Sequence, residues 1–304
     1  MAKRARGPRP NRTRPIHLIT RYALCAALLF AGQSAVAAEA RLLSRFHWQT
    51  DNPELGGFSA LEVGEDGLSL TVLMDRGHVM QGQLLRSGDS ITGVSITSET
   101  DLRGPDGQPL DEEDDDSEGL AEDGLGGFYV SFEGPARVWH YADQASTPLQ
   151  IALPEHFAQM QGNASLEALA VLGGSRLLTL PERSGRFDKP FPVFQIVNGV
   201  WSDHLKVART GPFVITGADV GPDGYLYILE RDFVGVGFRS RIRRMDLADG
   251  ATETLMVSAS WEYGNLEGIS AWRDGEGRLR LTTVSDNNFL AIQKTEFVEF
   301  VVTD

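Results

Sequence analysis

Short apolar runs separated by glycine-rich turns recur along most of the chain. The runs are rich in Val, Leu, Ile, Tyr and Phe, and they are bounded by turns such as Asp66-Gly67, Gly173-Gly174 and Asp223-Gly224. Runs of about four to six residues with such boundaries predict β-hairpins rather than helices. The second strands of the expected hairpins are Leu70 to Met74, Phe128 to Phe132, Leu177 to Leu180 and Tyr225 to Leu229.

A short motif precedes each hairpin, so the chain contains an internal repeat. In its clearest form an acidic residue is followed by a small residue and then by apolar ones. The copies recur about every 50 residues, a period typical of propeller and solenoid repeats. The clear copies are Asp116 to Ala121, Ser165 to Ala170 and Asn265 to Ser270, and the weaker ones are Gly57 to Leu61 and Thr216 to Val220.

Five hairpin repeats and additional closure strands predict an all-β fold, a single β-propeller of about six four-stranded blades. The first full blade is expected from Gly56 onward, with outer strands at Val79 to Leu85 and Ser90 to Ile96. The ring is expected to close by pairing an N-terminal strand, Leu42 to Trp48, with a C-terminal strand, Phe297 to Val302. Each of these strands would otherwise leave an exposed edge.

The repeat also predicts where acidic side chains gather. A hairpin returns the chain to the end from which it started, so an acid that opens the first strand and one that closes the second lie at the same edge of the sheet. Around a ring of blades these edges form one mouth, and a loop from Pro181 to Pro192 is expected beside it. The acids expected there are Asp75, Glu118, Glu133, Glu167, Glu182, Asp219, Glu230, Glu267 and Asp286.

Carboxylates gathered in this way repel one another, by about 1 kcal/mol per pair at about 4 Å in water and by more near a protein interior. A divalent cation would relieve that repulsion, and calcium is the expected ion because it prefers oxygen ligands. The alternative is structural, with the carboxylates capping hairpins and accepting backbone N–H bonds where blades meet.

The start of the chain predicts export from the cytoplasm. Residues 1–21 are basic, residues 22–32 are apolar, and Ala35-Val36-Ala37 resembles a cleavage site. This order is typical of a secretory signal over residues 1–37, followed by one propeller domain over residues 38–304 in the periplasm or outside the cell. The apolar part is shorter than the about 20 residues of a membrane span, so no stable span is expected after cleavage, the alternative being a permanent anchor.

The amino-acid composition limits which classes of binding partner are expected. Cys25 is the only cysteine and lies in the leader, so the mature chain has no disulfide. Seven of the 28 basic residues and none of the 42 acidic residues also lie there, which leaves 21 basic against 42 acidic residues. Such a negative balance argues against nucleic acid and favours cations, or anionic substrates bridged by a metal. A monomer is expected.

The ordered motifs resemble the phytase-like family of secreted proteins, described as having esterase-like activity. The resemblance covers about Gly56 to Val302 and implies a β-propeller that hydrolyses a small-molecule phosphoric or carboxylic ester with a bound metal. No dense Asp-Lys pattern is present, so a multiply phosphorylated substrate is not expected. The matching residues are Asp116 to Ala121, Gly127 to Gly134, Leu180 to Arg183, Asn265 to Ile269, Ser285 to Phe289 and Gln293 to Glu296.

Transferred by position, the resemblance implies roles for individual residues. The implied metal ligands are Glu118, Glu167, Asp219, Glu267 and Asp286. Arg76, Arg183 and Arg231 are the implied phosphate contacts, and the alternative for each is an ion pair with an acid of a neighbouring blade. The substrate-binding set is completed by Glu133, Glu182, Glu230 and Asn287.

Two other functions remain open. The six histidines fall outside the repeat motifs and no Ser-His-Asp arrangement emerges, so a non-catalytic propeller that binds a ligand or partner at the same mouth is one alternative. The other is a lactonase-like propeller, which would also centre a divalent cation on Glu, Asn and Asp side chains.

Overall fold

The computed structural model describes residues 7, 37–50, 52, 55–155, 157, 166–173, 176–235, 237–289 and 293–304. The predicted signal and its cleavage site, residues 1–37, lie outside this part of the chain except for Gly7 and Ala37. Within the described ranges, no helix has the length and apolar character needed to cross a bilayer.

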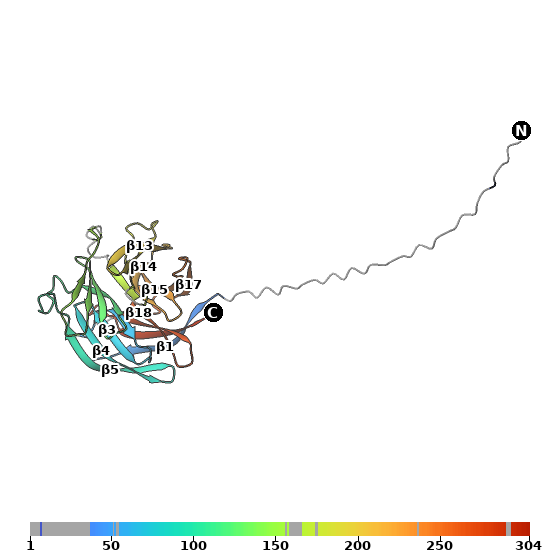
Figure 1. Cartoon of the computed structure of the whole chain (residues 1–304). Helices are drawn as coiled ribbons and strands as arrows, with labels where there is room; N and C mark the ends of the chain where they lie inside the picture. Colours follow the sequence, from blue (N-terminus) through green and yellow to red (C-terminus); the bar gives the residue numbers. More distant parts are fainter. Residues whose placement is uncertain are drawn as a thin grey trace. The chain divides into compact units, whose positions relative to one another are not determined.

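The described strands form five four-stranded antiparallel sheets, each of which is one blade (Figure 1). Blade 1 contains β2 (Phe58–Val63), β3 (Ser69–Met74), β4 (His78–Ser87) and β5 (Ser90–Asp101). Blade 2 contains β6 (Ser117–Glu122), β7 (Phe128–Phe132), β8 (Arg137–Tyr141) and β9 (Leu149–Ile151). Blade 3 contains β10 (Leu166–Val171), β11 (Arg176–Pro181), β12 (Phe191–Val197) and β13 (Val200–Val207).

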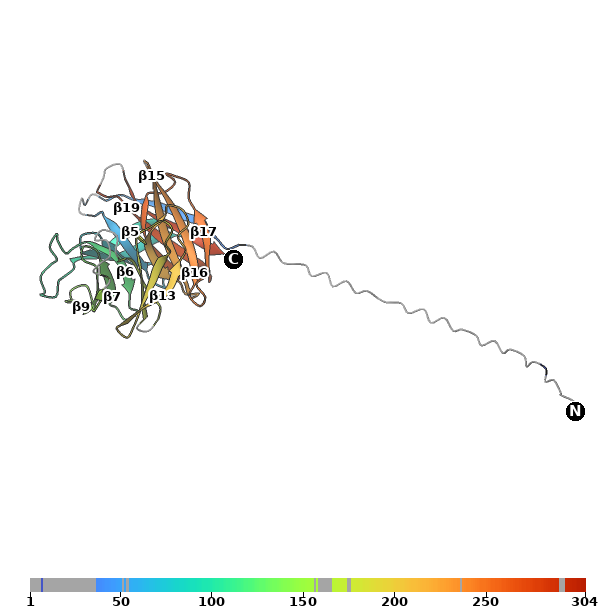
Figure 2. The same ribbon diagram turned by 90° about the horizontal axis from the view of Figure 1, so that it is seen from above.

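The remaining two blades complete the ring. Blade 4 contains β14 (Val214–Val220), β15 (Tyr225–Val234), β16 (Gly237–Asp246) and β17 (Thr252–Val257). Blade 5 contains β18 (Asn265–Arg273), β19 (Leu279–Asp286), β20 (Thr295–Thr303) and β1 (Glu39–Trp48). In Figure 1, β3, β4 and β5 follow one another outward from the centre, and Figure 2 shows β6, β7 and β9 in the same order.

The first strand of each blade lies at the hub. These inner strands pack in the circular order β2, β6, β10, β14, β18 and back to β2. The fold is therefore an all-β propeller with five blades, and the prediction of about six was wrong. The excess arose because the closure strands do not build a blade of their own: β1 supplies the outermost strand of blade 5.

Closure of the ring by the two ends of the domain is confirmed. Strand β1 pairs antiparallel with β20, from Glu39 opposite Thr303 to Trp48 opposite Thr295. This pairing joins two strands that would otherwise expose their backbone N–H and C=O groups.

Apolar side chains fill the space between neighbouring blades. Leu178 and Val193 of blade 3 lie in one buried cluster with Ile228 and Met245 of blade 4. Similar clusters lie between the other pairs of neighbours. Full burial of a large apolar side chain contributes about 1.5–3 kcal/mol. Because both faces of a blade are covered near the hub, the first two strands of a blade, such as β2 and β3, read as nearly continuous apolar runs. Outermost strands such as β5 and β13 are largely exposed.

Every inner strand contains a β-bulge at the same place in the repeat motif. The pairing with the second strand shifts by one residue there, which leaves one extra residue on the inner strand. A bulge bends the strand and redirects the side chain of the extra residue. The bulged residues are Ser59, Glu118, Glu167, Thr216 and Glu267.

The residue after each bulge is always alanine or glycine, and the contact between blades requires a small residue there. A Cβ atom on Gly268 would lie 2.8 Å from the backbone nitrogen of Leu61 and 2.9 Å from the Cα of Ala60. A Cβ on Gly217 would lie 2.5 Å from the carbonyl oxygen of Glu267. In the repeat motif, the acidic residue thus places its side chain at the hub, and the small residue after it permits the close contact with the next blade.

Candidate functional site

Two positions from each blade define the mouth of the propeller. The first is the bulged residue of the inner strand. The second follows the residue of the second strand that pairs with the residue just before the bulge, as Glu133 follows Phe132, the partner of Ser117. The residues at this second position are Asp75, Glu133, Glu182, Arg231 and Asp286.

The three glutamates at bulges are electrostatically coupled at the hub. Burial, and then repulsion from Glu267, raise the pKa of Glu118 well above its usual value. Burial and repulsion from Glu118 do the same to the pKa of Glu167. Burial raises the pKa of Glu267 to about 8, although nearby Arg231 favours its charged form. Glu118, Glu167 and Glu267 therefore lie near one another, as expected from the repeat, while their role as metal ligands stays a prediction.

Glu167 lacks a bonded partner, in contrast to Glu267, which is bonded to Arg231 and Asn265. Its side chain is 5% exposed. Within the described part of the chain it makes no hydrogen bond and no ion pair, and it interacts electrostatically with Glu118, Glu267, Glu182 and Arg231. A buried carboxylate without hydrogen bonds is costly to keep charged. The carboxylate of Glu167 is therefore stabilised either by taking up a proton or by a cation bound beside it.

A compact group of carboxylates lies on the blade 2 side of the mouth. One oxygen each from Asp116, Glu118 and Glu133 lie within 4.8 Å of one another. The backbone holds this group together, since the N–H of Glu133 donates to the carbonyl oxygen of Asp116 at 2.9 Å. Three carboxylate oxygens at such separations suit a hard cation such as Ca²⁺. Asp116 belongs to the repeat motif but was not among the predicted ligands.

Arg231 lies on the other side of the mouth and joins three blades. Its guanidinium donates to Oδ1 of Asn265 at 2.9 Å, to Glu182 at 3.3 Å and to Glu267. Burial alone would lower the pKa of Arg231, but Glu267, Glu167 and Glu182 raise it further than burial lowers it. Arg231 therefore stays charged and partly neutralises Glu182 and Glu267.

Asp75 and Asp286 lie next to each other where blades 1 and 5 meet. Burial and repulsion from Asp286 raise the pKa of Asp75 to about 6, against the opposing effect of Arg76. The guanidinium of Arg76 stacks over the ring of Phe289 at 4.6 Å. Oδ1 of Asn287 accepts the N–H of Phe289 at 3.0 Å and that of Gly57 at 3.4 Å, so Asn287 connects these two blades.

Glu230 is not at the mouth, and its predicted place there was wrong. It precedes Arg231, and successive residues of a strand point to opposite faces of the sheet. The side chain of Glu230 is therefore fully buried inside blade 4. Its carboxylate accepts hydrogen bonds from Arg241 at 2.6 Å and from Arg243 at 2.8 and 2.5 Å. The mouth position of blade 4 is thus occupied by a positively charged side chain, that of Arg231.

Asp219 was also expected at the mouth, and this too was wrong. It lies three residues after the bulge at Thr216, opposite Tyr227 and near the turn that ends the inner strand. Its carboxylate accepts the N–H of Ala271 at 2.7 Å. Burial raises the pKa of Asp219 to about 7, and the carboxylate also raises the pKa of Glu62. Asp219 and Glu62 form a second acidic pair, away from the mouth, with Glu122 close enough to raise the pKa of both.

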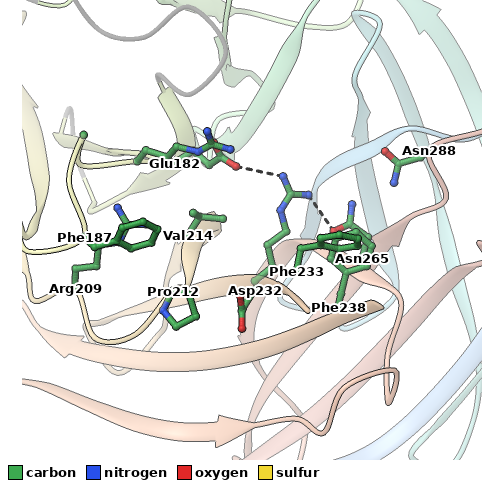
Figure 3. A pocket seen from close by; sticks show the side chains of 13 residues that line it. Glu182, Phe187, Arg209, Pro212, Val214, Asp232, Phe233, Phe238, Asn265 and Asn288 are labelled. Atoms are coloured by element: carbon green, nitrogen blue, oxygen red, sulfur yellow. Dashed lines mark hydrogen bonds and ion pairs between the residues drawn. The ribbon is translucent and has the colours of Figure 1, made fainter. Parts of the chain in front are cut away.

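A pocket of about 730 Å³ opens beside Arg231, where loops of blades 3, 4 and 5 meet (Figure 3). Figure 3 shows Phe187 and Arg209 on one side of the pocket, with Phe233 and Phe238 on the opposite side. Arg183 also lines it and pairs with Glu182 at 2.9 Å. The 181–192 loop does lie beside the mouth, but Phe187 and Arg209 were not predicted. Phe187 lies in the loop between β11 and β12 of blade 3, and Arg209 lies in the loop that connects blade 3 to blade 4.

Sequence comparison identifies a related family. The family model described as "Phytase-like: Esterase-like activity of phytase" matches residues 53–289. A search of curated proteins finds no match.

Several solved structures are similar to this chain. One is an aldose sugar dehydrogenase from Streptomyces coelicolor in its PQQ-bound form, with 14% identity and a TM-score of 0.45 over 85% of this chain and 98% of that chain. Another is a luciferin-regenerating enzyme, with 11% identity and a TM-score of 0.44 over 81% and 92% of the two chains. A third belongs to a nidogen/laminin complex, with 15% identity, a TM-score of 0.39 and coverage of 68% and 71%. Identities this low carry no information on chemistry.

Proposed function

The chain belongs to the phytase-like family, and from that premise we propose that it is a metal-dependent hydrolase that cleaves phosphoric or carboxylic esters at the mouth of the propeller. The observation that carries the proposal is the convergence of Asp116, Glu118 and Glu133, whose oxygens lie within 4.8 Å of one another. An all-oxygen donor set of high negative charge suits a hard divalent cation, and calcium is the proposed ion.

The proposed cation would be held by Asp116, Glu118 and Glu133, with Glu167 and Glu267 beside it. When bound, such an ion polarises an ester oxygen and makes a coordinated water more acidic. Glu167 is the proposed general base, because it is buried beside Glu118 and has no hydrogen bond within the described ranges. Its raised pKa brings proton uptake closer to neutral pH, which suits a base.

The arginines have separate proposed roles. Arg231 is held by Asn265, Glu182 and Glu267, so it acts as a fixed positive charge at the rim of the mouth. The side chain of Arg183 is 52% exposed and leaves donors for a substrate anion. A guanidinium can bind two oxygens of a phosphate or carboxylate at once. Arg183 is therefore the proposed substrate contact, and Arg231 the group that positions the carboxylates.

The test compares turnover with and without metal. Protein stripped with a chelator is assayed on p-nitrophenyl phosphate and p-nitrophenyl acetate while calcium is titrated back. We expect turnover to require the ion and to fall by about 100-fold or more in a Glu118→Gln, Glu133→Gln variant, the size of loss seen when a transition-state contact is removed. The control is Glu113→Gln, which changes an exposed acid just before the motif. Full turnover in chelator, or unchanged turnover in the double variant, would remove the assignment.

A lactonase-like reaction is the second candidate, and one observation favours it. Asn265 donates to Glu267 at 2.6 Å, and the carboxylate of Asp286 is close enough to raise the pKa of Glu267. These residues supply the Glu, Asn and Asp oxygens that a lactonase-like centre would use. Hydrolysis of a γ-lactone, lost in Glu267→Gln and retained in Glu118→Gln, would move the catalytic ion to this side of the mouth. Stabilisation by calcium without turnover of any ester or lactone would instead favour a binding propeller.

We further propose that the mature protein acts as a monomer in the periplasm or outside the cell, on a small molecule and without nucleic-acid partners. The leader of residues 1–37 and the acidic balance of the remaining chain motivate this proposal. N-terminal sequencing of the exported protein and its size in solution test it. A retained leader or a stable oligomer would contradict it.

A further inference from the structure

The pocket beside the mouth contains an arginine that the hydrolase proposal does not use. Arg209 lies between two aromatic rings, 4.4 Å from the centroid of Phe187 and 5.1 Å from that of Phe191. Its NH1 donates to Oγ of Ser184 at 3.3 Å. Within the described residues no carboxylate pairs with Arg209, and its Nε is buried without a hydrogen-bond partner. The guanidinium is thus fixed in place but not neutralised.

A second guanidinium lies close to Arg209. Arg183 and Arg209 both line the pocket, and burial and repulsion from Arg183 lower the pKa of Arg209 against the opposing effect of Glu182 and Glu230. The acids of the lining are already engaged: Glu182 pairs with Arg183 and Arg231, and Asp232 pairs with Arg239 at 2.5 Å. The uncompensated charge of the pocket is therefore positive, and an anion between Arg183 and Arg209 would relieve their repulsion.

The walls of the same pocket are aromatic. Phe187 is 69% exposed and Phe233 is 60% exposed, and they lie on opposite sides of the space in Figure 3. The ring of Phe233 packs on that of Phe238 with centroids 5.3 Å apart, which supports it from behind. Large apolar side chains exposed together commonly mark a binding site. The volume of about 730 Å³ lies within the range of about 300–1,000 Å³ typical of small-molecule pockets.

We propose that this pocket binds an organic anion in which a carboxylate or phosphate is attached to an aromatic or similarly flat apolar group. The anionic group contacts Arg183 and Arg209, and the flat group lies between Phe187 and Phe233. The inference rests on the proposed function, because it names the class of ester that would be the substrate. The carboxylate or phosphate group of that ester would lie in this pocket, next to Arg231 and the carboxylates of the mouth. It favours aryl esters and aryl phosphates over sugar phosphates, which lack a flat apolar face.

Binding measured in chelator tests the pocket without any hydrolysis. The probes are 1-naphthyl phosphate and 1-naphthoate, compared by calorimetry with inorganic phosphate and with neutral 1-naphthalenemethanol. We expect 1-naphthyl phosphate to bind at least about ten times more tightly than either partial probe, since each of them lacks one half of the recognition. Equal affinity for inorganic phosphate would show that the rings contribute nothing. Equal affinity for the neutral alcohol would show that the arginines contribute nothing. Either result would overturn the proposal.

Substitutions separate the two halves of the pocket. Arg209→Met should weaken 1-naphthyl phosphate by about tenfold or more and leave the neutral alcohol unchanged, whereas Arg209→Lys should restore part of the anion affinity. Phe233→Ala should weaken binding of all three naphthyl probes and leave inorganic phosphate unchanged. The matched control is Arg186→Gln in the 181–192 loop beside the pocket, whose exposed side chain pairs with Asp188. Unchanged affinities in folded Arg209→Met and Phe233→Ala proteins would refute the assignment.

The outcome is independent of catalysis. The Glu118→Gln, Glu133→Gln variant should lose turnover and still bind 1-naphthyl phosphate in chelator. If wild-type protein hydrolyses p-nitrophenyl esters but shows no preference for naphthyl anions, the pocket inference fails while the hydrolase proposal stands. Binding without turnover would give the reverse result.

Discussion

Arg231 of blade 4 donates a hydrogen bond to Glu267 of blade 5 at the hub of the propeller. Glu267 occupies a bulge in its inner strand, and Arg231 occupies the position that is acidic in the other four blades. One guanidinium therefore stands in a ring of carboxylates and also bonds to Glu182 of blade 3. It is a built-in counter-ion that covers part of the mouth and leaves the Asp116 side to the proposed cation.

Replacing Arg231 should destabilise the metal-free protein. In Arg231→Gln the buried Glu267 loses its charged partner, and breaking a buried pair from one side costs about 3–5 kcal/mol. Calcium at about 100 times its dissociation constant should return about 2.7 kcal/mol if it binds at the mouth. Urea unfolding in chelator and in calcium measures both effects. The control is Arg41→Gln, which removes an exposed pair with Glu39, and an equally small loss in Arg231→Gln would contradict the role described here.

The acidic pair away from the mouth should make stability depend on pH. Burial raises the pKa of Asp219 from 3.8 to about 7, and burial together with Asp219 raises the pKa of Glu62 above 4.5. A raised pKa means that the folded protein binds the proton more tightly than the unfolded chain. The resulting stabilisation is complete below the unfolded pKa values and is lost as the pH rises through the folded ones.

Stability should therefore fall between about pH 4 and pH 7, and Asp219→Asn should reduce that fall because it removes one titrating group. The measurement is urea unfolding in chelator at several pH values. The free energy of unfolding of the variant is subtracted from that of the wild type, so that the pH-dependent contributions of the carboxylates at the mouth cancel. A difference that does not change with pH would show that Asp219 titrates normally.

Glu299 should be important for the junction between blades 5 and 1. Its buried carboxylate accepts bonds from Arg86 at 2.8 and 2.7 Å, from Arg280 at 2.7 Å and from Thr282 at 2.8 Å. Glu299→Gln leaves the guanidinium of Arg86 without its anion and removes one of the three carboxylates that pair with Arg280, so we expect a loss of about 3–5 kcal/mol in urea unfolding. The exposed Glu39→Gln should cost no more than about 1 kcal/mol. Similar losses in the two variants would mean that the buried ion pairs add little.

The small residues after the bulges should not tolerate a methyl group. In Gly268→Ala the new Cβ meets backbone atoms of Leu61 and Ala60, which cannot move without shifting blade 1. Overpacking of this kind costs about 1–3 kcal/mol. Gly275→Ala is the matched control, because no atom lies within 4 Å of its added Cβ. Thermal unfolding of both variants decides the point, and equal melting temperatures would show that the inner strands can separate without penalty.

Most of the fold could be predicted from the sequence because its signals are local. Apolar runs and Asp-Gly turns specify hairpins, and the repeat specifies how they are arranged. The blade count was wrong because it depends on a pairing between the two ends of the domain. The closure of β1 onto β20 was itself predicted, but the sequence does not show that β1 fills a vacancy in blade 5 rather than beginning another sheet.

The site was predictable only where the repeat is regular. Glu118, Glu167 and Glu267 share one motif position, and the bulge places all three at the hub. Glu230 and Arg231 are adjacent, and a difference of one residue decides which of them faces the mouth. Strand register therefore had to come from the structure. The pocket residues Phe187 and Arg209 lie in loops outside the repeat motif, so no periodic pattern in the sequence predicts their position.

The pairing of β1 with β20 has a consequence for how the protein folds. Arg45 and Glu296, which bond across these strands at 2.6 Å, are 251 residues apart in the chain. A contact of such high order has a large loop-closure entropy and forms late. Folding should accordingly be slow, with the last sheet completed only after the others have assembled. Once the circle is complete, no blade can detach without exposing the edges of its neighbours, so unfolding should be a cooperative event of the whole domain.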